Sequence, residues 1–182
     1  GAAVAREAHP SCKGWVPGGA ERPDSARAVL RALKEDSPDV VLIHDAARPF
    51  VPLDDVLRVA SVAAEHGAAL LVAPVVDTVK RLRSDGSVET TVPRERLARA
   101  LTPQAFRASV LRRAWEAAGE GVWSDEAALV ERLGGTVMAV TGDPRNVKVT
   151  HPGDLETISG LVAGRGRVGQ GVDVHPLAAG RR

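Results

Sequence analysis

An acidic and a basic residue follow an apolar run in the first third of the chain. The segment VVLIHDAARPFV, residues 40–51, begins with four apolar residues and continues into His44 and Asp45, then into a turn that ends at Arg48 and Pro49. Such a run is typical of a strand covered on both faces of a parallel sheet, and open α/β sheets bind ligands outside the carboxyl ends of their strands. Asp45 is therefore a candidate metal ligand. Arg48, which Pro49 keeps on extended backbone, is a candidate phosphate ligand. The alternative is that these two side chains only pair with each other or cap the next helix.

Composition argues against several classes of function. The 182 residues are enough for one domain with a tail. Because 24 Lys and Arg stand against 23 Asp and Glu, and the chain has only three Trp and two Phe, nothing favours nucleic-acid binding. Cys12 is the single cysteine, and no apolar stretch approaches the roughly 20 residues of a membrane helix. We expect a cytoplasmic protein that binds neither nucleic acid nor membranes and recognises phosphate only locally.

The elements expected around the central segment alternate between helix and strand. Asp24 and Ser25 are good N-cap residues before a run of apolar residues at helical spacing. After the central strand, a helix is expected from Asp54 to Gly67 and a buried strand at 69–75. This order predicts a Rossmann-like, mostly parallel sheet with helices on both faces. The glycine turn before the first helix offers backbone N–H groups to a ligand, although simple capping of the helix is the plainer explanation.

The alternation breaks at residues 76–92. Their sequence, VDTVKRLRSDGSVETTV, is β-prone but polar on both faces, with Asp85 and Gly86 at a hairpin turn. An isolated hairpin is marginal in water, so we expect a projecting β-arm that packs on another subunit. Beyond the arm, the pattern predicts helices at 105–118, 125–133 and 152–162 and strands at 136–140 and 146–150.

The end of the chain carries two further motifs. Residues 164–169, GRGRVG, match the dinucleotide fingerprint GxGxxG but lack the preceding strand and following helix that the fingerprint needs, so a linker is expected. Asp173 and His175 fall on one face of a strand-like segment and are compatible with two metal ligands, although a pair alone is a weak signal. The chain has no initiator Met and stops just after this segment, so we expect it to be a piece of a longer protein.

Several segments occur in the order and spacing of a known family: GGAERPDS, IHDAARPFV, APVVDTVKR, ALTPQAF, SDEAALVE and GDPRNVKVT. Residues 16–162 resemble 2-C-methyl-D-erythritol 4-phosphate cytidylyltransferase. The segment RVGQGVDVHPL resembles the first strand of 2-C-methyl-D-erythritol 2,4-cyclodiphosphate synthase, which some bacteria fuse to the first enzyme in this order. The resemblance implies a cytidylyltransferase domain at 1–162, a linker at 163–166 and the start of a second α/β domain at 167–182. The family's amino-terminal glycine-rich loop is not in the sequence, so we expect this fragment to be inactive by itself.

The resemblance also implies an activity and its residues. The family transfers a cytidylyl group from CTP to 2-C-methyl-D-erythritol 4-phosphate, releases pyrophosphate and uses Mg²⁺. Asp45 would serve the metal and the substrate hydroxyls, and Arg48 would help to hold the substrate. The other implied residues are Gly19, Ser25, Ala46 and Ala47 around the cytosine, Thr78, Thr102 and Lys148 at the substrate phosphate, and Arg94 from the arm of the neighbouring subunit in a homodimer.

Departures and alternatives accompany this assignment. Ala20 replaces an acidic residue often found in the cytosine turn, and Arg145 stands where some members have Asp, so Arg145 is not assigned. Taken singly, the two threonines could be ordinary strand hydroxyls and Lys148 a solvated cation. In the second domain, Asp173 and His175 would bind Zn²⁺ or another divalent cation. The alternative function is a non-catalytic nucleotide-sensing or oligomerisation module on the same fold.

Overall fold

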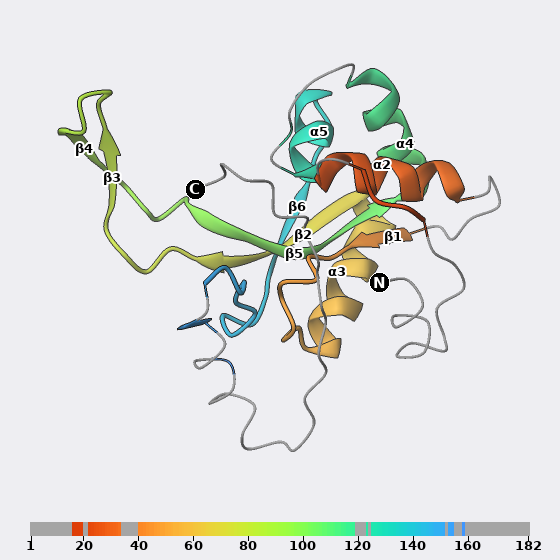
Figure 1. The fold of residues 1–182 in the computed structure, drawn as a ribbon, viewed down its shortest axis with the longest axis horizontal. Coiled ribbons are helices and arrows are strands. Elements are labelled where there is room, and N and C mark those ends of the chain that lie inside the picture. The colour runs from red at the N-terminus through yellow and green to blue at the C-terminus, as the bar shows by residue number, and fades with distance from the viewer. Residues whose placement is uncertain are drawn as a thin grey trace, which may run out of the picture.

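The computed structural model describes residues 16–19, 22–33, 40–118, 123, 125–151, 153, 154 and 158. A sheet lies between helices, and a hairpin projects from one side of the molecule (Figure 1). The predicted α/β fold with a projecting arm is therefore confirmed. The predicted linker at 163–166 and second domain at 167–182 lie outside the described residues. In chain order the elements are α2 (Arg22–Ala32), β1 (Val40–Ile43), α3 (Leu53–His66), β2 (Ala68–Pro74), β3 (Val79–Leu82), β4 (Val88–Val92), β5 (Ala98–Arg107), α4 (Ala108–Ala117), α5 (Glu126–Arg132) and β6 (Met138–Thr141).

The main sheet has the strand order β1-β5-β2-β6. Strand β5 runs antiparallel to both β1 and β2, whereas β2 and β6 are parallel. The described sheet is therefore mixed, and the prediction of a mostly parallel sheet is wrong. The physical reason is that parallel neighbours need a crossover connection, usually a helix, whereas the hairpin arm of β3 and β4 connects β2 to β5.

The prediction of a helix over 105–118 is wrong at its start, because Ala105 to Arg107 belong to β5 and α4 begins at Ala108. The physical reason is that residues 101–106 are all buried. A central strand covered on both faces shows no alternation of polar and apolar residues that would separate it from a buried helix.

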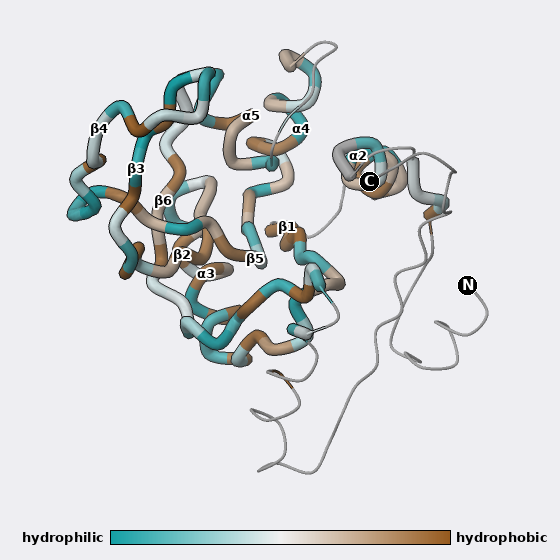
Figure 2. The backbone as a smooth tube through the Cα atoms, turned by 60° about the vertical axis from the view of Figure 1, so that its left-hand side comes forward, coloured by the Kyte–Doolittle hydropathy of each residue, from teal (hydrophilic) through white to brown (hydrophobic). Residues whose placement is uncertain are grey.

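Two apolar clusters pack on opposite faces of the sheet. Because successive side chains of a strand point to opposite faces, Ala68 and Leu70 of β2 join one cluster and Leu71 joins the other. Helices α2, α4 and α5 cover the first face, where Phe106 and Leu111 are fully buried. Helix α3 covers the second face. Figure 2 shows the apolar character of β1 and β2 between these layers.

Several predicted boundaries move in the structure. Helix α2 begins at Arg22, so Asp24 and Ser25 lie inside its first turn instead of capping it. Helix α3 begins at Leu53 and ends at His66, and it is capped by Gly67, whose φ of 97° favours glycine. The predicted strand at 146–150 is wrong, because these residues have no regular secondary structure. Of the predicted helix at 152–162, residues 153, 154 and 158 are described, and all three are helical.

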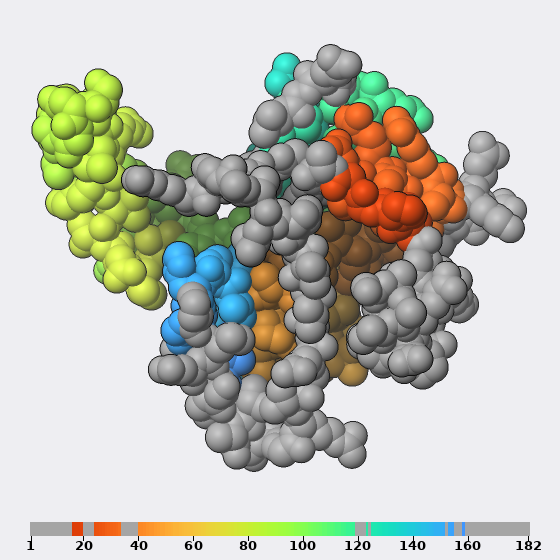
Figure 3. Space-filling model, viewed as in Figure 1, coloured from red at the N-terminus to blue at the C-terminus, as the bar shows by residue number. Residues whose placement is uncertain are grey.

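The predicted arm is a two-stranded hairpin of β3 and β4. Its turn is held by Asp85, whose Oδ1 accepts the Ser87 backbone N–H at 2.8 Å and the Ser87 hydroxyl at 2.7 Å. Gly86 has a φ of 85°, as this kind of turn requires. The space-filling view shows the arm standing away from the body of the molecule (Figure 3). Among the described helices, none is both long and apolar enough to cross a membrane.

Candidate active site

The pairing of β1 with β5 brings Asp45 to Thr102. In the register of these antiparallel strands, Ile43 lies opposite Gln104. Two residues forward from Ile43 and two residues back from Gln104, Asp45 therefore lies opposite Thr102. The Asp45 backbone N–H donates to the Thr102 hydroxyl oxygen at 3.1 Å. Thr102 is buried, with 5% of its surface exposed. Its hydroxyl is therefore used to hold the backbone at Asp45.

The ring of His44 connects this hydroxyl to the following turn. Its Nδ1 lies 2.9 Å from the Thr102 hydroxyl oxygen, and its Nε2 lies 3.0 Å from the carbonyl oxygen of Arg48. Because a carbonyl oxygen only accepts, Nε2 carries the hydrogen. In the neutral ring, Nδ1 then accepts from the Thr102 hydroxyl. Ala46 and Ala47 lie in the turn from Asp45 to Arg48. This turn is closed by the Arg48 N–H, which donates to the Asp45 carbonyl at 3.0 Å.

Two cations converge on the Asp45 carboxylate. Lys148 Nζ lies 3.3 Å and Arg48 Nε 3.5 Å from the same oxygen, Oδ2. The Asp45 and Arg48 side chains are only 13% and 11% exposed, whereas that of Lys148 is 45% exposed. Two cations on one carboxylate leave a net positive charge, and Lys148 is the cation of this group that solvent and a ligand can reach. The structure thus brings together three of the four predicted catalytic residues.

The loop that carries Lys148 is fixed at several points. At its start, the Asp143 N–H donates to Asp55 Oδ2 at 2.7 Å. A Cβ on Gly142 would lie 3.3 Å from that oxygen, so the backbone approaches closely there. At its end, the Val149 N–H donates to the Ala47 carbonyl at 2.8 Å. The loop therefore joins α3 to the turn beside Asp45.

The two residues predicted near a cytosine also meet. The Gly19 N–H donates to the Ser25 hydroxyl oxygen at 3.1 Å, and a Cβ at Gly19 would lie 2.1 Å from Asp24 Cβ, so only glycine fits. This turn precedes α2, as predicted.

Thr78 and Arg94 lie at the base of the arm and are exposed. Arg94 donates to the carbonyl of Val76 across the base of the arm. Neither Thr78 nor Arg94 takes part in the ion pairs that join Asp45 to Arg48 and Lys148. The predicted metal pair, Asp173 and His175, lies outside the described residues.

Two participants were not assigned from the sequence: His44, which directly precedes Asp45, and Asn146, which lies two residues before Lys148. Arg48 Nη1 donates to the Asn146 carbonyl at 2.9 Å, and Asn146 Nδ2 donates to the Thr102 carbonyl at 2.7 Å. Their positions beside assigned residues were the only signal that the sequence offered. Neither hydrogen bond can be inferred before the strand pairing is known.

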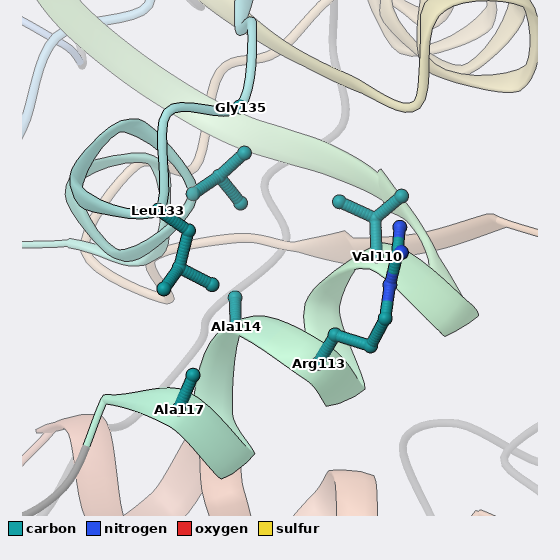
Figure 4. Close-up of a pocket in the computed structure, with 7 residues that line it drawn as sticks. Val110, Arg113, Ala114, Ala117, Leu133 and Gly135 are labelled. Atoms are coloured by element: carbon teal, nitrogen blue, oxygen red, sulfur yellow. The ribbon is translucent and has the colours of Figure 1, made fainter.

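An apolar pocket lies elsewhere, between α4 and α5 (Figure 4). It has a volume of about 320 Å³, and Ala114 and Ala117 of α4 face Leu133 across it. Gly135 permits the close approach, because a Cβ there would lie 2.7 Å from Val130 Cγ1. None of the predicted site residues lines this pocket, so it is separate from the charged cluster.

An acidic residue and two cations at the carboxyl end of β1, on a mixed sheet with helices on both faces, define an α/β protein of the nucleotidyltransferase type. A family profile described as IspD: 2-C-methyl-D-erythritol 4-phosphate cytidylyltransferase matches residues 9–163. The chain belongs to this family.

Known relatives agree with this assignment. The chain is 46% identical over 171 residues to the bifunctional enzyme IspD/IspF of Rhodopseudomonas palustris (strain BisB5), covering 91% of this chain and 43% of that protein. It is 47% identical over 155 residues to 2-C-methyl-D-erythritol 4-phosphate cytidylyltransferase of Saccharopolyspora erythraea, covering 81% of this chain and 67% of that protein. The crystal structure of the same enzyme from Thermus thermophilus superposes with a TM-score of 0.73 at 38% identity, covering 84% of this chain and 76% of that chain. The chain therefore spans less than half the length of its bifunctional relatives.

Proposed function

We propose that the complete protein transfers the cytidylyl group of CTP to 2-C-methyl-D-erythritol 4-phosphate with release of pyrophosphate. Family membership supports this reaction, and the observation that carries it is the Asp45 carboxylate held between Arg48 and Lys148. In the proposed step, a phosphate oxygen of the substrate attacks the α-phosphorus of CTP. The bond from that phosphorus to the bridging oxygen breaks, and pyrophosphate leaves with the bonding electrons. Such a transfer needs positioning and charge neutralisation more than covalent chemistry.

The three charged residues differ in what they can do. Lys148 is exposed enough for its ammonium group to contact the substrate phosphate directly. The guanidinium of Arg48 is engaged by the Asn146 carbonyl and by Asp45, so it supplies positive charge from inside the protein. Asp45 orients both cations and offers its carboxylate oxygens to substrate hydroxyls or to a metal. Thr102, whose hydroxyl is occupied by Asp45 and His44, would support the phosphate site from behind.

The family resemblance implies Mg²⁺, and the donor set fits it. Mg²⁺ is usually held by one or two carboxylates together with substrate phosphates. Asp45 supplies one carboxylate, and among the described residues no group of three His, Cys, Asp or Glu side chains could hold a metal without further ligands. Bound there with CTP, the ion would neutralise phosphate charge. The cytosine contacts proposed for Gly19, Ser25, Ala46 and Ala47 complete the nucleotide site.

Three further features belong to this proposal. The arm of β3 and β4 would form a homodimer and bring Thr78 and Arg94 to the neighbour's substrate phosphate, because both residues are exposed at its base. The bifunctional relatives support a second domain with cyclodiphosphate synthase activity. Asp173 and His175 would bind Zn²⁺ or another divalent cation there. The cytoplasmic location stays a prediction.

A product assay tests the reaction. The complete protein is incubated with Mg²⁺, 2-C-methyl-D-erythritol 4-phosphate and CTP. Pyrophosphate and the cytidylylated form of the substrate are then quantified. We expect both products in equal amounts, and far less with ATP, GTP or UTP. Binding of CTP without turnover would instead support the nucleotide-sensing module. Loss of Zn²⁺ binding in Asp173→Ala and His175→Ala variants of the complete protein tests the second metal site separately.

A further inference from the structure

We propose that Asn146 is a positioning residue that sets where Arg48 and Lys148 stand relative to Asp45. Asn146 is completely buried, although it lies in a loop without regular secondary structure. Buried polar side chains are kept where their hydrogen bonds are made. The inference rests on the proposed function, because it assigns a role at the same site.

The backbone and side chain of Asn146 bind separate parts of that site. Its carbonyl oxygen accepts from Arg48 Nη1 at 2.9 Å, and its Nδ2 donates to the Thr102 carbonyl at 2.7 Å. Its backbone N–H donates to the Asp143 carbonyl at 3.0 Å, which closes the turn before it. One residue therefore links the loop after β6 to β5 and to the segment after β1.

The side-chain bond has only one workable orientation. Turning the amide over would set Oδ1 against the Thr102 carbonyl oxygen, and two acceptors repel each other. In the orientation observed, Oδ1 is buried and has no hydrogen-bond partner among the described residues. The single donation from Nδ2 to Thr102 thus fixes the side chain and, through it, the backbone carbonyl that Arg48 contacts.

The same anchor controls Lys148. Lys148 follows two residues later, and Val149 is tied to the Ala47 carbonyl at 2.8 Å. The loop is therefore fixed on both sides of Lys148, at Asn146 and at Val149. Removing the Asn146 anchor releases one side, so the 3.3 Å pair between Lys148 and Asp45 should open. Asn146 acts through these charged residues and needs no contact with substrate.

A labelling experiment measures this position without any activity. The protein is acylated with limiting acetic anhydride, and the labelling rates of Lys148 and Lys80 are compared by mass spectrometry. Lys80 lies on the arm, where it donates to the Thr91 hydroxyl at 2.7 Å, and serves as the internal reference. In Asn146→Ala and Asn146→Leu we expect Lys148 to react several-fold faster, because an amino group that is no longer held 3.3 Å from the Asp45 carboxylate is more accessible to the reagent. The Lys80 rate should stay constant. Asp45→Asn gives the rate of a fully released Lys148.

The matched control is Gln104→Leu. Gln104 is an equally buried amide on β5, but it binds α5, donating to Asp125 Oδ2 at 3.0 Å and accepting from the Ala127 N–H at 3.2 Å. This variant should leave the Lys148 rate unchanged. Asn146→Leu keeps the bulk of the side chain. Whichever of Asn146→Leu and Asn146→Ala retains its near-ultraviolet circular dichroism is folded, and its Lys148 labelling rate decides whether the proposal holds. An unchanged Lys148 rate in that folded variant would overturn the proposal.

Kinetics of the complete protein provide the second readout. A misplacement of about 1 Å at a site can cost on the order of 10²-fold in rate, so we expect a loss of that order in kcat/KM for Asn146→Leu. If Asn146 acts through Arg48 and Lys148, adding Asn146→Leu to a variant that already carries Arg48→Ala and Lys148→Ala should cost little more than that variant alone. Full multiplication of the two losses would contradict the role. Absence of cytidylyl transfer in the unaltered protein would refute the proposed function, whereas the labelling result would still decide the role of Asn146.

Discussion

Asp45 donates its backbone N–H to the hydroxyl oxygen of Thr102 at 3.1 Å, although Asp45 follows β1 and Thr102 lies on β5, which come together only in the folded sheet. The bond fixes the backbone of the site's acidic residue. Its loss should therefore be felt as loss of stability as well as loss of position.

Thr102→Val tests this bond, because valine keeps the shape of threonine and removes the hydroxyl. We expect the free energy of unfolding to fall by about 1–3 kcal/mol, since the Asp45 N–H and the His44 ring lose their partner in a partly buried place. Urea denaturation followed by circular dichroism measures the change. Thr102→Ser keeps the hydroxyl and should retain most of the stability, and equal losses in the two variants would contradict the assignment.

Lys148→Ala should lower cytidylyl transfer strongly in the complete protein. Removing one preorganised charge-stabilising donor costs on the order of 10²–10³ in kcat. Pyrophosphate release at saturating CTP and substrate measures the loss. Arg113→Ala removes an exposed cation of α4, away from the charged cluster and the arm, and serves as the matched control. Turnover near that of the unaltered protein for Lys148→Ala would remove Lys148 from the site.

Asp55 and Arg58 form an ion pair whose partners should matter unequally. Asp55 is 6% exposed in its side chain and also accepts the Asp143 N–H, whereas the Arg58 side chain is 55% exposed. We expect Asp55→Ala to cost about 1–3 kcal/mol of unfolding free energy, because the Asp143 N–H is left without its acceptor. Arg58→Ala should cost less than about 1 kcal/mol, as exposed ion pairs do. Urea melts compare the two, and equal costs would show that the ion pair rather than the loop contact matters.

The arm should form the dimer. Replacing residues 82–89 with a short glycine turn should give a monomer in sedimentation velocity and abolish activity in the complete protein. Mixing an Arg94→Ala subunit with an Asp45→Ala subunit is the sharper measurement, because sites shared across the interface should recover part of the activity in the heterodimer. A deletion variant that remains dimeric would refute the arm's role.

Acid should weaken the loop at Asp143. Hydrogen bonds from the Arg145 side chain hold the pKa of the Asp143 carboxyl below its ordinary value of 3.8, with a smaller contribution from the Arg145 backbone N–H and against the opposing effect of burial. A lowered pKa in the folded state stabilises the protein fully above about 3.8, and this contribution is lost as the pH falls through the folded pKa. Asp143→Asn should therefore be less stable than the unaltered chain near neutral pH. The difference should shrink in urea melts carried out at progressively lower pH below 3.8, and a difference that does not change with pH would contradict this origin.

The sequence predicted the local elements better than their pairing. The apolar run before Asp45 and the turn chemistry at Asp85 and Gly86 are local signals, and both elements form as expected. Strand β5 was missed in part, because its last residues, Ala105 to Arg107, lead directly into α4 with no turn between the strand and the helix. Its antiparallel place between β1 and β2 depends on long-range packing.

The same limit applies to the site. Asp45, Arg48 and Lys148 were assigned from their motifs and do lie together. The connecting roles of His44 and Asn146 could not be predicted, because each depends on the register of β1 with β5. The contacts of Thr78 and Arg94 with a neighbouring subunit remain predictions.

The strand order has a mechanical consequence for the charged cluster. Asp45 follows β1 and Lys148 follows β6, and these two strands are the opposite edges of the sheet. The ion pair between Asp45 and Lys148 therefore links the segments that follow the two edge strands. A phosphate that binds Lys148 in place of Asp45 would break this link between the two edges. We therefore expect amide exchange along β6 to change when a phosphate occupies the site.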